Sequence, residues 1–510
     1  MEARRLNDGL AVYSFLPYGS GFDVRVDPSV ICCHPDRLAG SIRFPTRLRR
    51  VLDIACGSGK QILVSALLNP DVDFHGVDGT PEHIDDARRY ARRLNLKNVT
   101  FECADLRDWR PPANAFDLIT CSGTFSWVPP DVQRAILHAL SVGLAIDGIA
   151  SLHLLTMPGS GAMIEARKVV VNVTREQIDA TSKLAAVRAH VATLTPPADD
   201  EDDSKQGTQV RRILRRFLDE EDYSVVHEML SADISAFFFR EIGELASRFG
   251  LHVVGDSDFT LSRPTWLPPG PVATMYLAST SWDERQELID MFGGRGGARG
   301  ALISRSPRTA GTAVFSFDGL HVRLRRWVPA RRKQDVVAIA PDVEETLSST
   351  ALAVLDALEK SFPESVLVDE LPHEDRDRVM LRFVELGFVS VASTSQTCIS
   401  WSSGYPMLFD FTRTEIEFSS RALTTRTGES LTAHPAAVAA LSLCDGTRSI
   451  SELRSLIVSQ ALLPPSQLDK ESGGGKRWWL DCDSPKISNI CTDEEAKRLL
   501  EVAHEYGFFE

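Results

Sequence analysis

The sequence lacks any uninterrupted apolar run of about 18 residues, the length that a helix needs to cross a bilayer. Its first residues, MEARRLNDGLAVYSF, also lack the long apolar stretch of a signal peptide. Nine cysteines are scattered along the chain, without a CxxC pair and without the cysteine and histidine spacing of a metal site. We therefore expect a cytoplasmic protein with reduced thiols, no membrane span and no bound metal.

Basic residues are too few for a protein that binds nucleic acid with its whole surface. Lys and Arg number 56 against 70 Asp and Glu, so the formal net charge is −14, whereas phosphate binding needs clustered positive charge.

What the chain does have is length. A chain of 510 residues is too long for a single hydrophobic core, and about two to four domains are expected.

Apolar runs of strand length alternate with helical segments in the first part of the chain. The expected strands are 51–55, 73–78, 99–106, 115–124 and 148–157, and the expected helices are 59–68, 81–96 and 131–144. This alternation is typical of an α/β sheet with mostly parallel strands. Ligands of such sheets bind beyond the carboxyl ends of the strands.

The pattern changes after residue 157. Residues 161–234 are mainly helical and contain the acidic run PPADDEDDSKQG, so we interpret them as an insertion. An amphipathic helix at 235–250 and strands at 251–259 and 300–306 are expected to complete the sheet. Near the end, a helix pair at 435–460 and the strand-like RWWLDCD favour a winged-helix-like unit. The expected domains are the first part of the core at 1–160, a regulatory or dimerisation insertion at 161–234, the end of the core at 235–306, a middle domain at 307–415 and a C-terminal winged-helix-like domain at 416–510.

The sequence DIACGSG at 53–59 places two glycines one residue apart between an expected strand and an expected helix. Their backbone freedom lets a ligand approach closely at Gly57 and Gly59. The third glycine of a dinucleotide fingerprint is absent, so a diphosphate lacks much of its cradle. Asp78 ends the second strand, where a carboxylate can accept both ribose hydroxyls, and Asp105 ends the third, where it can accept from an adenine amino group. These features predict a site for an adenosine without phosphates. The alternative is an ordinary α/β turn with surface acids.

The motifs DIACGSG, GVDGT, ADL and FDLITCSG follow one another as in the class I S-adenosylmethionine-dependent methyltransferases, which this chain resembles. The resemblance implies a Rossmann-like α/β sheet, here with a helical insertion and a C-terminal α+β extension. It also implies S-adenosylmethionine as cofactor, with Asp53 orienting the glycine turn and the methionine amine, Asp78 holding the ribose and Asp105 holding the adenine. The cofactor-binding residues that it implies are Tyr18, Asp53, Ala55, Gly57, Gly59, Asp78, Gly79, Ala104, Asp105, Leu106 and Ser122.

Further stretches resemble one subfamily, in which the methyltransferase domain is coupled to a regulatory helical domain and a C-terminal extension. They are PYGSGFD at 17–23, HPDRLA at 34–39, GTFSWVPPDVQRAIL at 123–137, TMPGSG at 156–161 and HEML at 227–230. The subfamily includes bacterial protein-lysine methyltransferases that modify outer-membrane proteins. The chain departs from it at PGSG, 158–161, where an aromatic residue is usual. Because this strand end borders the acceptor pocket, the usual substrate need not carry over.

Four residues are candidates for the acceptor pocket: Tyr18, Phe125, Trp127 and Glu228. Tyr18 precedes the first strand, in a segment that can fold over the cofactor or simply pack. Phe125 and Trp127 follow the fourth strand, where an aromatic face can stabilise a cationic amine, although Trp127 can equally staple the loop to the sheet. Glu228 can accept a proton or bind a lysine head, and the alternative is a surface ion pair.

The resemblance implies N-methylation of a lysine amine on a protein or peptide. Two alternatives stay open: a methyltransferase that acts on a nitrogen or oxygen of a small molecule or natural-product precursor, and a non-catalytic regulatory protein that binds the cofactor. A homodimer is also expected, because apolar residues of the helical insertion need burial. They are Val169, Val170, Val171 and Leu184.

Overall fold

The computed structural model describes most of the chain. The described residues are 22–177, 179–194, 207–219, 222–231, 233–262, 270–279, 281–292, 297–309, 316–325, 332–340, 343–362, 364–372, 374–395, 403–418, 422–426, 430–432, 435–459, 493–506 and 508–509.

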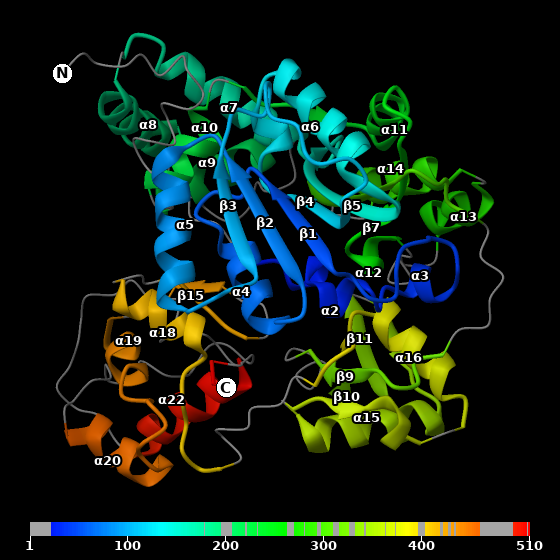
Figure 1. The fold of residues 1–510 in the computed structure, drawn as a ribbon, viewed down its shortest axis with the longest axis vertical. Coiled ribbons are helices and arrows are strands. Elements are labelled where there is room, and N and C mark those ends of the chain that lie inside the picture. The colour runs from blue at the N-terminus through cyan, green and yellow to red at the C-terminus, as the bar shows by residue number, and fades with distance from the viewer. Residues whose placement is uncertain are drawn as a thin grey trace.

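An eight-stranded sheet forms the centre of the molecule (Figure 1). Its strands are β1 (Arg50–Ile54), β2 (Asp73–Asp78), β3 (Val99–Cys103), β4 (Phe116–Cys121), β5 (Leu144–Thr156), β6 (Ala236–Phe237), β7 (His252–Asp256) and β8 (Ala298–Ser304). The order is β3-β2-β1-β4-β5-β8-β7, with β6 paired to β5. β8 runs antiparallel to both of its neighbours, and the other pairs are parallel. The predicted Rossmann-like sheet is confirmed.

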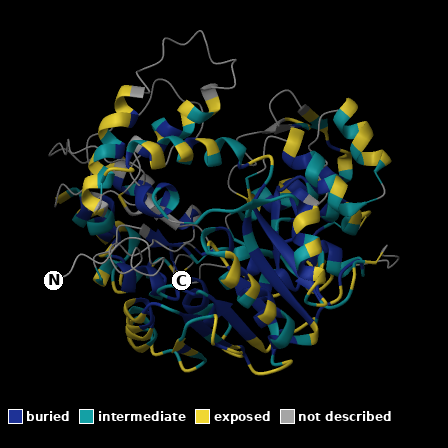
Figure 2. Cartoon of the chain, turned by 90° about the horizontal axis from the view of Figure 1, so that it is seen from above, coloured by how far each residue is buried: buried dark blue, intermediate teal, exposed yellow. Residues whose placement is uncertain are grey.

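Successive strand residues point to opposite faces of the sheet, and both faces carry apolar side chains. Helices therefore cover both faces. Val51 belongs to an apolar cluster with α4 (Lys60–Leu68) and α5 (Pro81–Arg93), whereas the next residue, Leu52, belongs to a cluster with α6 (Pro130–Gly143) and α11 (Phe239–Ser247). Figure 2 shows the result, with buried strands between helices whose outer faces are exposed. All five strands predicted before residue 160 are present.

The segment 235–250 differs from the single predicted helix, because β6 precedes α11. β5 extends beyond β4, whose last paired residue is Cys121 opposite Leu152. The backbone of β5 after that point needs a new hydrogen-bonding partner. β6 supplies it, pairing with Leu155 and Thr156, and Phe237 O accepts from Met157 N.

The insertion is helical, as predicted, and it has its own apolar core. Its helices are α7 (Gly161–Val173), α8 (Ala180–Leu194), α9 (Gly207–Asp219) and α10 (Asp222–Met229). Val170 is buried in that core, and Val169 and Leu184 pack against it, whereas Val171 is 45% exposed. Most of the apolar surface that motivated the homodimer is therefore buried within one chain, and the homodimer stays a prediction.

The N-terminal segment and the connections around β7 contribute short helices. They are η1 (Val24–Val26), α2 (Pro28–Ile31), α3 (Pro35–Leu38), η2 (Phe125–Trp127), α12 (Phe259–Ser262), α13 (Pro271–Ala278) and α14 (Trp282–Phe292). α13 and α14 pack against each other.

Two further groups of elements follow the sheet and lie below it in Figure 1. The first comprises β9 (His321–Leu324), β10 (Arg332–Lys333), β11 (Val336–Ala340), β12 (Val343–Thr346), α15 (Ser349–Ser361), β13 (Val366–Leu367), η4 (Val368–Glu370), α16 (Arg376–Glu385) and β14 (Val389–Ala392). The second comprises α18 (Asp410–Glu417), β15 (Ala422–Thr424), β16 (Ser430–Thr432), α19 (Pro435–Leu441), α20 (Ile450–Ser459) and α22 (Asp493–Glu505). The helix pair at 435–460 is confirmed. The strand-like RWWLDCD lies outside the described residues, so the winged-helix-like form and the domain boundaries stay predictions.

The second group is joined to the methyltransferase sheet through α18. Lys60, the first residue of α4, forms a 3.0 Å ion pair with Glu415 on α18, and both side chains are buried. On α5, the Tyr90 ring stacks on Phe411 and meets the edge of Phe418. α4 begins directly after the glycine turn, so this contact reaches the neighbourhood of the candidate site.

Candidate cofactor and acceptor site

The glycine turn after β1 uses left-handed backbone at Ala55, Gly57 and Gly59, with φ of 56°, 55° and 78°. A Cβ added at Gly57 would meet nothing within 4 Å, so the turn is open to a ligand there. A Cβ at Gly59 would lie 2.8 Å from the Phe101 ring. Packing against β3 thus accounts for Gly59, and space for a ligand is found at Gly57.

The Asp78 carboxylate is anchored at the end of β2 by three donors. Oδ2 accepts from Gly57 N at 2.9 Å, and Oδ1 accepts from Thr80 N at 2.8 Å and from His83 Nδ1 at 3.4 Å. Burial by itself would raise the pKa of Asp78, but the interactions with His83, Thr80 and Gly57 outweigh it and lower that pKa. The carboxylate is therefore ionised, and it directly joins the glycine turn to β2.

His83 was not among the residues predicted from the sequence. It lies five positions after Asp78, in the first turns of α5, and its side chain is buried. When a helix begins just after a strand, the side chains of its first turns lie close to the end of that strand. That spacing was the available signal, but a histidine at this place does not by itself indicate a contact with the strand end.

Asp53 lies beneath the turn and is buried, with Thr120 Oγ1 donating to its Oδ1 at 2.7 Å. Burial, reinforced by the negative charge of Asp78 and opposed by the Thr120 hydrogen bond, raises the pKa of Asp53 to about 7. A cation placed beside this carboxyl would therefore ionise it near neutral pH.

Asp105 follows β3 and is fixed by Arg107. The Arg107 guanidinium donates to both Asp105 oxygens, at 2.9 to 3.2 Å, and Arg107 N donates to Oδ1 at 2.9 Å. These bonds, led by the side-chain bond from Arg107, lower the pKa of Asp105. Ala104 N donates to Asp78 O at 2.9 Å, which holds the two predicted adenosine acids at neighbouring strand ends. The remaining predicted neighbours, Gly79 and Leu106, are half-buried beside them.

The loop after β4 is tied down by its own hydrogen bonds. Ser126 Oγ accepts from Leu155 N at 2.8 Å, and Ser126 O accepts from Ser235 N at 2.7 Å. The Phe125 ring is fully buried, with its centroid 5.6 Å from that of Phe237. Phe125 thus packs in the core, so its predicted place in a pocket wall has no support from its burial.

The other predicted residues are spread more widely. Ser122 is exposed at the end of β4, and Trp127 is half-buried in η2. Glu228 is half-buried on α10, which packs against α7 and α8, so the structure does not join it to the acids of the site. Tyr18 lies outside the described residues. The roles of these four residues stay predictions.

The unusual PGSG turn is bound to the start of β8. Ser160 Oγ donates to Gly297 O at 2.5 Å, and Thr156 N donates to the same oxygen at 2.8 Å. The small residues at this turn thus allow the end of β5 and the start of β8 to lie close together.

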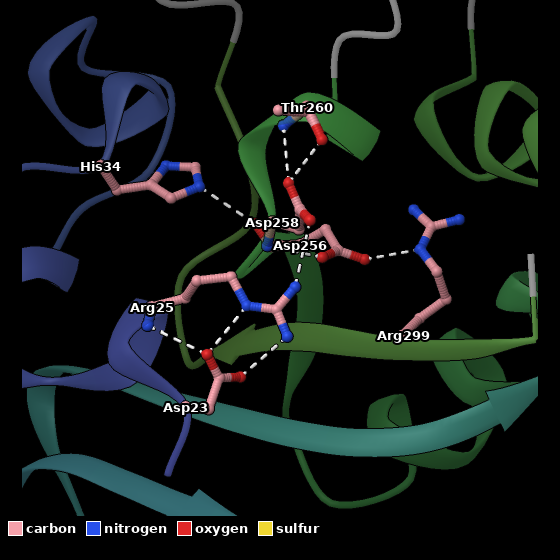
Figure 3. A network of polar contacts seen from close by, with 7 residues as sticks. All are labelled: Asp23, Arg25, His34, Asp256, Asp258, Thr260 and Arg299. Carbon is pink, nitrogen blue, oxygen red and sulfur yellow. Dashed lines mark hydrogen bonds and ion pairs between the residues drawn. The ribbon is translucent and has the colours of Figure 1, made fainter. Parts of the chain in front are cut away.

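A polar network, buried at Asp256 and partly exposed at Arg25, lies at the carboxyl end of β7 (Figure 3). Arg25 donates to Asp23 at 2.8 Å and to Asp258 at 3.1 Å. Asp23 N in turn donates to Gln61 Oε1 at 2.7 Å, so the N-terminal segment is bound to α4 beside the glycine turn. Sequence reasoning missed this network because its partners, such as Arg25 and Asp258, are 233 positions apart.

Arg299 completes this network from β8. Its side chain is fully buried and donates to Asp256 and Asp290, each at 2.7 Å, and to Gln286. His34 Nε2 donates to Asp256 O at 3.0 Å. Burial lowers the pKa of His34, despite the opposing charge of Asp36, so its imidazole is neutral at pH 7. The network fixes the end of β7 against β8 and the N-terminal segment.

Two negative findings apply to the residues that the structure describes. They contain no group of three or more histidine, cysteine or acidic side chains placed to hold a metal ion. None of their helices combines the length and the apolar character that a membrane span requires.

Residues 51–148 match the family model described as "Methyltransferase domain". Among curated proteins, the uncharacterized protein RP789 of Rickettsia prowazekii is 25% identical over 224 residues, which are 43% of this chain and 40% of that protein. The trans-aconitate 2-methyltransferase of Streptomyces avermitilis is 33% identical over 131 residues, which are 24% of this chain and 48% of that enzyme. The matched stretches thus span less than half the length of each of these relatives.

Among solved structures, PKMT2 from Rickettsia typhi in complex with AdoHcy matches 97% of this chain and 100% of its own, with a TM-score of 0.72 and 18% identity. The shared fold therefore extends through the insertion and the elements after the sheet. Residues 51–148 are thus a methyltransferase domain, and the chain that carries them has the fold of a class I S-adenosylmethionine-dependent methyltransferase.

Proposed function

We propose that this protein transfers a methyl group from S-adenosylmethionine to a lysine amine of a protein or peptide. The observation that carries the proposal is the Asp78 carboxylate, ionised and bound to Gly57 N at an open glycine turn, with Asp105 just after the neighbouring strand. This arrangement supports a nucleoside site, with one acid for the ribose and one for the adenine.

Each residue of the site then has a defined task. Asp78 accepts the two ribose hydroxyls, and Asp105 accepts from the adenine amino group with its orientation set by Arg107. Asp53 faces the methionine amine, whose positive charge keeps this carboxyl ionised although its pKa is about 7 without it. The bound cofactor supplies an activated methyl group on a sulfonium. The protein therefore has to align the acceptor and exclude water.

The acceptor amine must lose its proton before it can attack, and a free lysine has a pKa of roughly 10.4. An apolar surrounding lowers that pKa, because it disfavours the charged form. The loop SGTFSW after β4 supplies hydroxyls and rings rather than a strong base. A lysine amine is compatible with such a pocket, since burial alone brings it toward its neutral form.

Two comparisons support this choice. The fold is shared over nearly the whole chain with PKMT2, which was solved with AdoHcy, the product that S-adenosylmethionine leaves after methyl transfer. The sequence motifs outside the sheet also resemble those of protein-lysine methyltransferases, and the elements after β8 provide surface for a large acceptor.

A small-molecule acceptor is the second candidate. It is favoured by the small PGSG turn, and by the relatives named trans-aconitate 2-methyltransferase and ubiquinone biosynthesis O-methyltransferase. Those similarities concern at most 24% of this chain. Matches of that extent say little about the acceptor.

The test is to incubate the protein with labelled S-adenosylmethionine and either the protein fraction or the small-molecule filtrate of a bacterial lysate. We expect label in the protein fraction that resists mild base, because an N-methyl amine is stable there and a methyl ester is not. Label found only in the filtrate would favour the second candidate. Asp78→Ala is the matched control, and it should abolish incorporation in both fractions.

A further inference from the structure

Helix α13 is unusual in being both apolar and exposed. Its sequence PVATMYLA contains no charged residue, and none of its residues is buried. Met275 is 52% exposed and Leu277 is 75% exposed. An isolated exposed apolar side chain is ordinary, but a helix that is apolar all round is normally covered by other protein.

Exposed apolar side chains also end the neighbouring helix α14, where Met291 is 46% and Phe292 is 56% exposed. α13 and α14 pack against each other. We call Met275, Leu277, Met291 and Phe292 the α13–α14 surface. They are four of the seven large apolar side chains that are strongly exposed in the described part of the chain, and such a concentration marks an interaction site.

The charged residues on α14 itself, apart from the buried Asp290, are mainly negative. Asp283, Glu284 and Glu287 lie on α14. Burial and the negative charges of Glu287 and Glu284 raise the pKa of Asp283, with Arg240 opposing them. The basic residue of α14, Arg285, is used internally, because it lies 5.4 Å from the Tyr276 ring and donates to Ser279 O. A partner with positive charge would relieve the crowding of carboxylates.

One end of this surface lies near the carboxyl end of β5. Asp290 directly precedes Met291 and holds Arg299 of β8. β8 begins beside Gly297, which accepts from Thr156 N at the carboxyl end of β5. In this class of sheet, ligands bind beyond those carboxyl ends.

We propose that the α13–α14 surface docks the protein that carries the acceptor lysine, through a segment of that protein that is both apolar and basic. This inference rests on the proposed function and names the chemistry of its partner. A second copy of this chain fits less well, because a two-fold contact would set α14 carboxylates against their own copies.

The experiment measures binding of a fluorescent peptide of alternating leucine and lysine to the full-length protein by anisotropy. We expect M275S/L277S to weaken binding by about tenfold, because two apolar contacts are lost. E284Q/E287Q keeps the size and the accepting oxygens of both side chains, and should weaken binding by about threefold at low salt but not at high salt. Ile146→Ser is the matched control, since Ile146 is 69% exposed near the amino end of β5, and it should leave binding unchanged.

Three results would overturn the proposal. The first is equal binding by the wild type and M275S/L277S. The second is equally tight binding of a leucine–glutamate peptide. The third is a dimer in sedimentation that M275S/L277S converts to monomers, which would identify a second copy as the occupant.

A methyl-transfer assay with the same variants separates this inference from the proposed function. We expect M275S/L277S to lower transfer to lysate proteins by about tenfold while the affinity for S-adenosylhomocysteine stays unchanged. If the wild type and this variant transfer methyl groups to lysine equally, docking at this surface is wrong and the proposed function stands. If peptide binding follows the variants but the wild type methylates no protein, the proposed function is wrong and the surface remains a binder of basic, apolar segments.

Discussion

At the scale of single residues, the acids of the site differ in how firmly they are held. Asp78 has three donors, two of them from the backbone of the turns that it joins. Asp53 is buried, accepts one hydrogen bond from Thr120 and lies near the negative charge of Asp78. One carboxyl is therefore ionised and fixed before a ligand arrives, whereas the other changes its charge near neutral pH.

His83→Ala should weaken S-adenosylhomocysteine binding by about five- to tenfold, because a hydrogen bond that orients a charged group is lost. The variant should also raise the pKa of Asp78 toward its ordinary value. Since the native pKa is lowered, Asp78 stabilises the fold at pH above about 4, and that stability is lost as pH falls through its native pKa. Calorimetry at pH 7 and urea unfolding between pH 3 and 6 check both effects. His83→Gln retains a donor and is the control; equal affinity in all three proteins would contradict the positioning role.

Asp53 predicts a pH dependence of cofactor binding. With its pKa raised to about 7 by burial, the carboxyl is mostly protonated at pH 5.5 and ionised at pH 8.5. If it faces the methionine amine, the affinity for S-adenosylhomocysteine should rise by up to about tenfold per pH unit below 7 and level off above it. The stability of the free protein should change in the opposite direction, because a raised pKa gives stability at low pH that is lost as pH rises through about 7. Asp53→Asn should bind weakly at every pH; a pH profile with the wild-type shape in this variant would rule out Asp53.

At the scale of elements, the sheet was predictable because segments of strand length, rich in apolar and β-branched residues, alternate with helical segments. β6 was not, because two residues inside an amphipathic pattern give no strand signal. The position of Asp78 followed from the end of a strand, but His83 and the Arg25 and Arg299 networks depend on partners that meet only in the folded chain. The two glycines of the turn also differ in a way that only the structure shows. Packing against Phe101 requires a glycine at position 59, whereas no neighbouring atom requires one at position 57.

The contact between α4 and α18 predicts a strong coupling between Lys60 and Glu415. Burial raises the pKa of Glu415, with the charge of Lys60 opposing it, so the carboxylate depends on its partner. Lys60→Met should destabilise the fold by about 3 kcal/mol, because it leaves a buried charge unpaired. K60M/E415Q should recover at least half of that loss, as measured by urea unfolding. Arg47→Met removes a pair with Asp71 that is exposed on both sides and should change little. Additive effects of the two buried substitutions would contradict the coupling.

At the scale of the whole molecule, the methyltransferase domain occupies residues 51–148, and most of the chain is added around it. The insertion extends from the end of β5, the N-terminal segment is bound to α4 and β7, and α18 holds the last group of elements against α4 and α5. These additions lie around the methyltransferase domain. Under the proposed function, they provide the surface that a protein acceptor requires.

The most direct test of a protein-lysine methyltransferase is the chemical identity of the methylated product. Lysate proteins labelled by the wild type with methyl-labelled S-adenosylmethionine would be hydrolysed to amino acids in strong acid and separated by chromatography. We predict label in N-methylated lysine, and none above background with Asp78→Ala, whose site lacks the ribose acceptor. Label in another amino acid, or label that mild base releases before hydrolysis, would contradict methylation of a lysine amine.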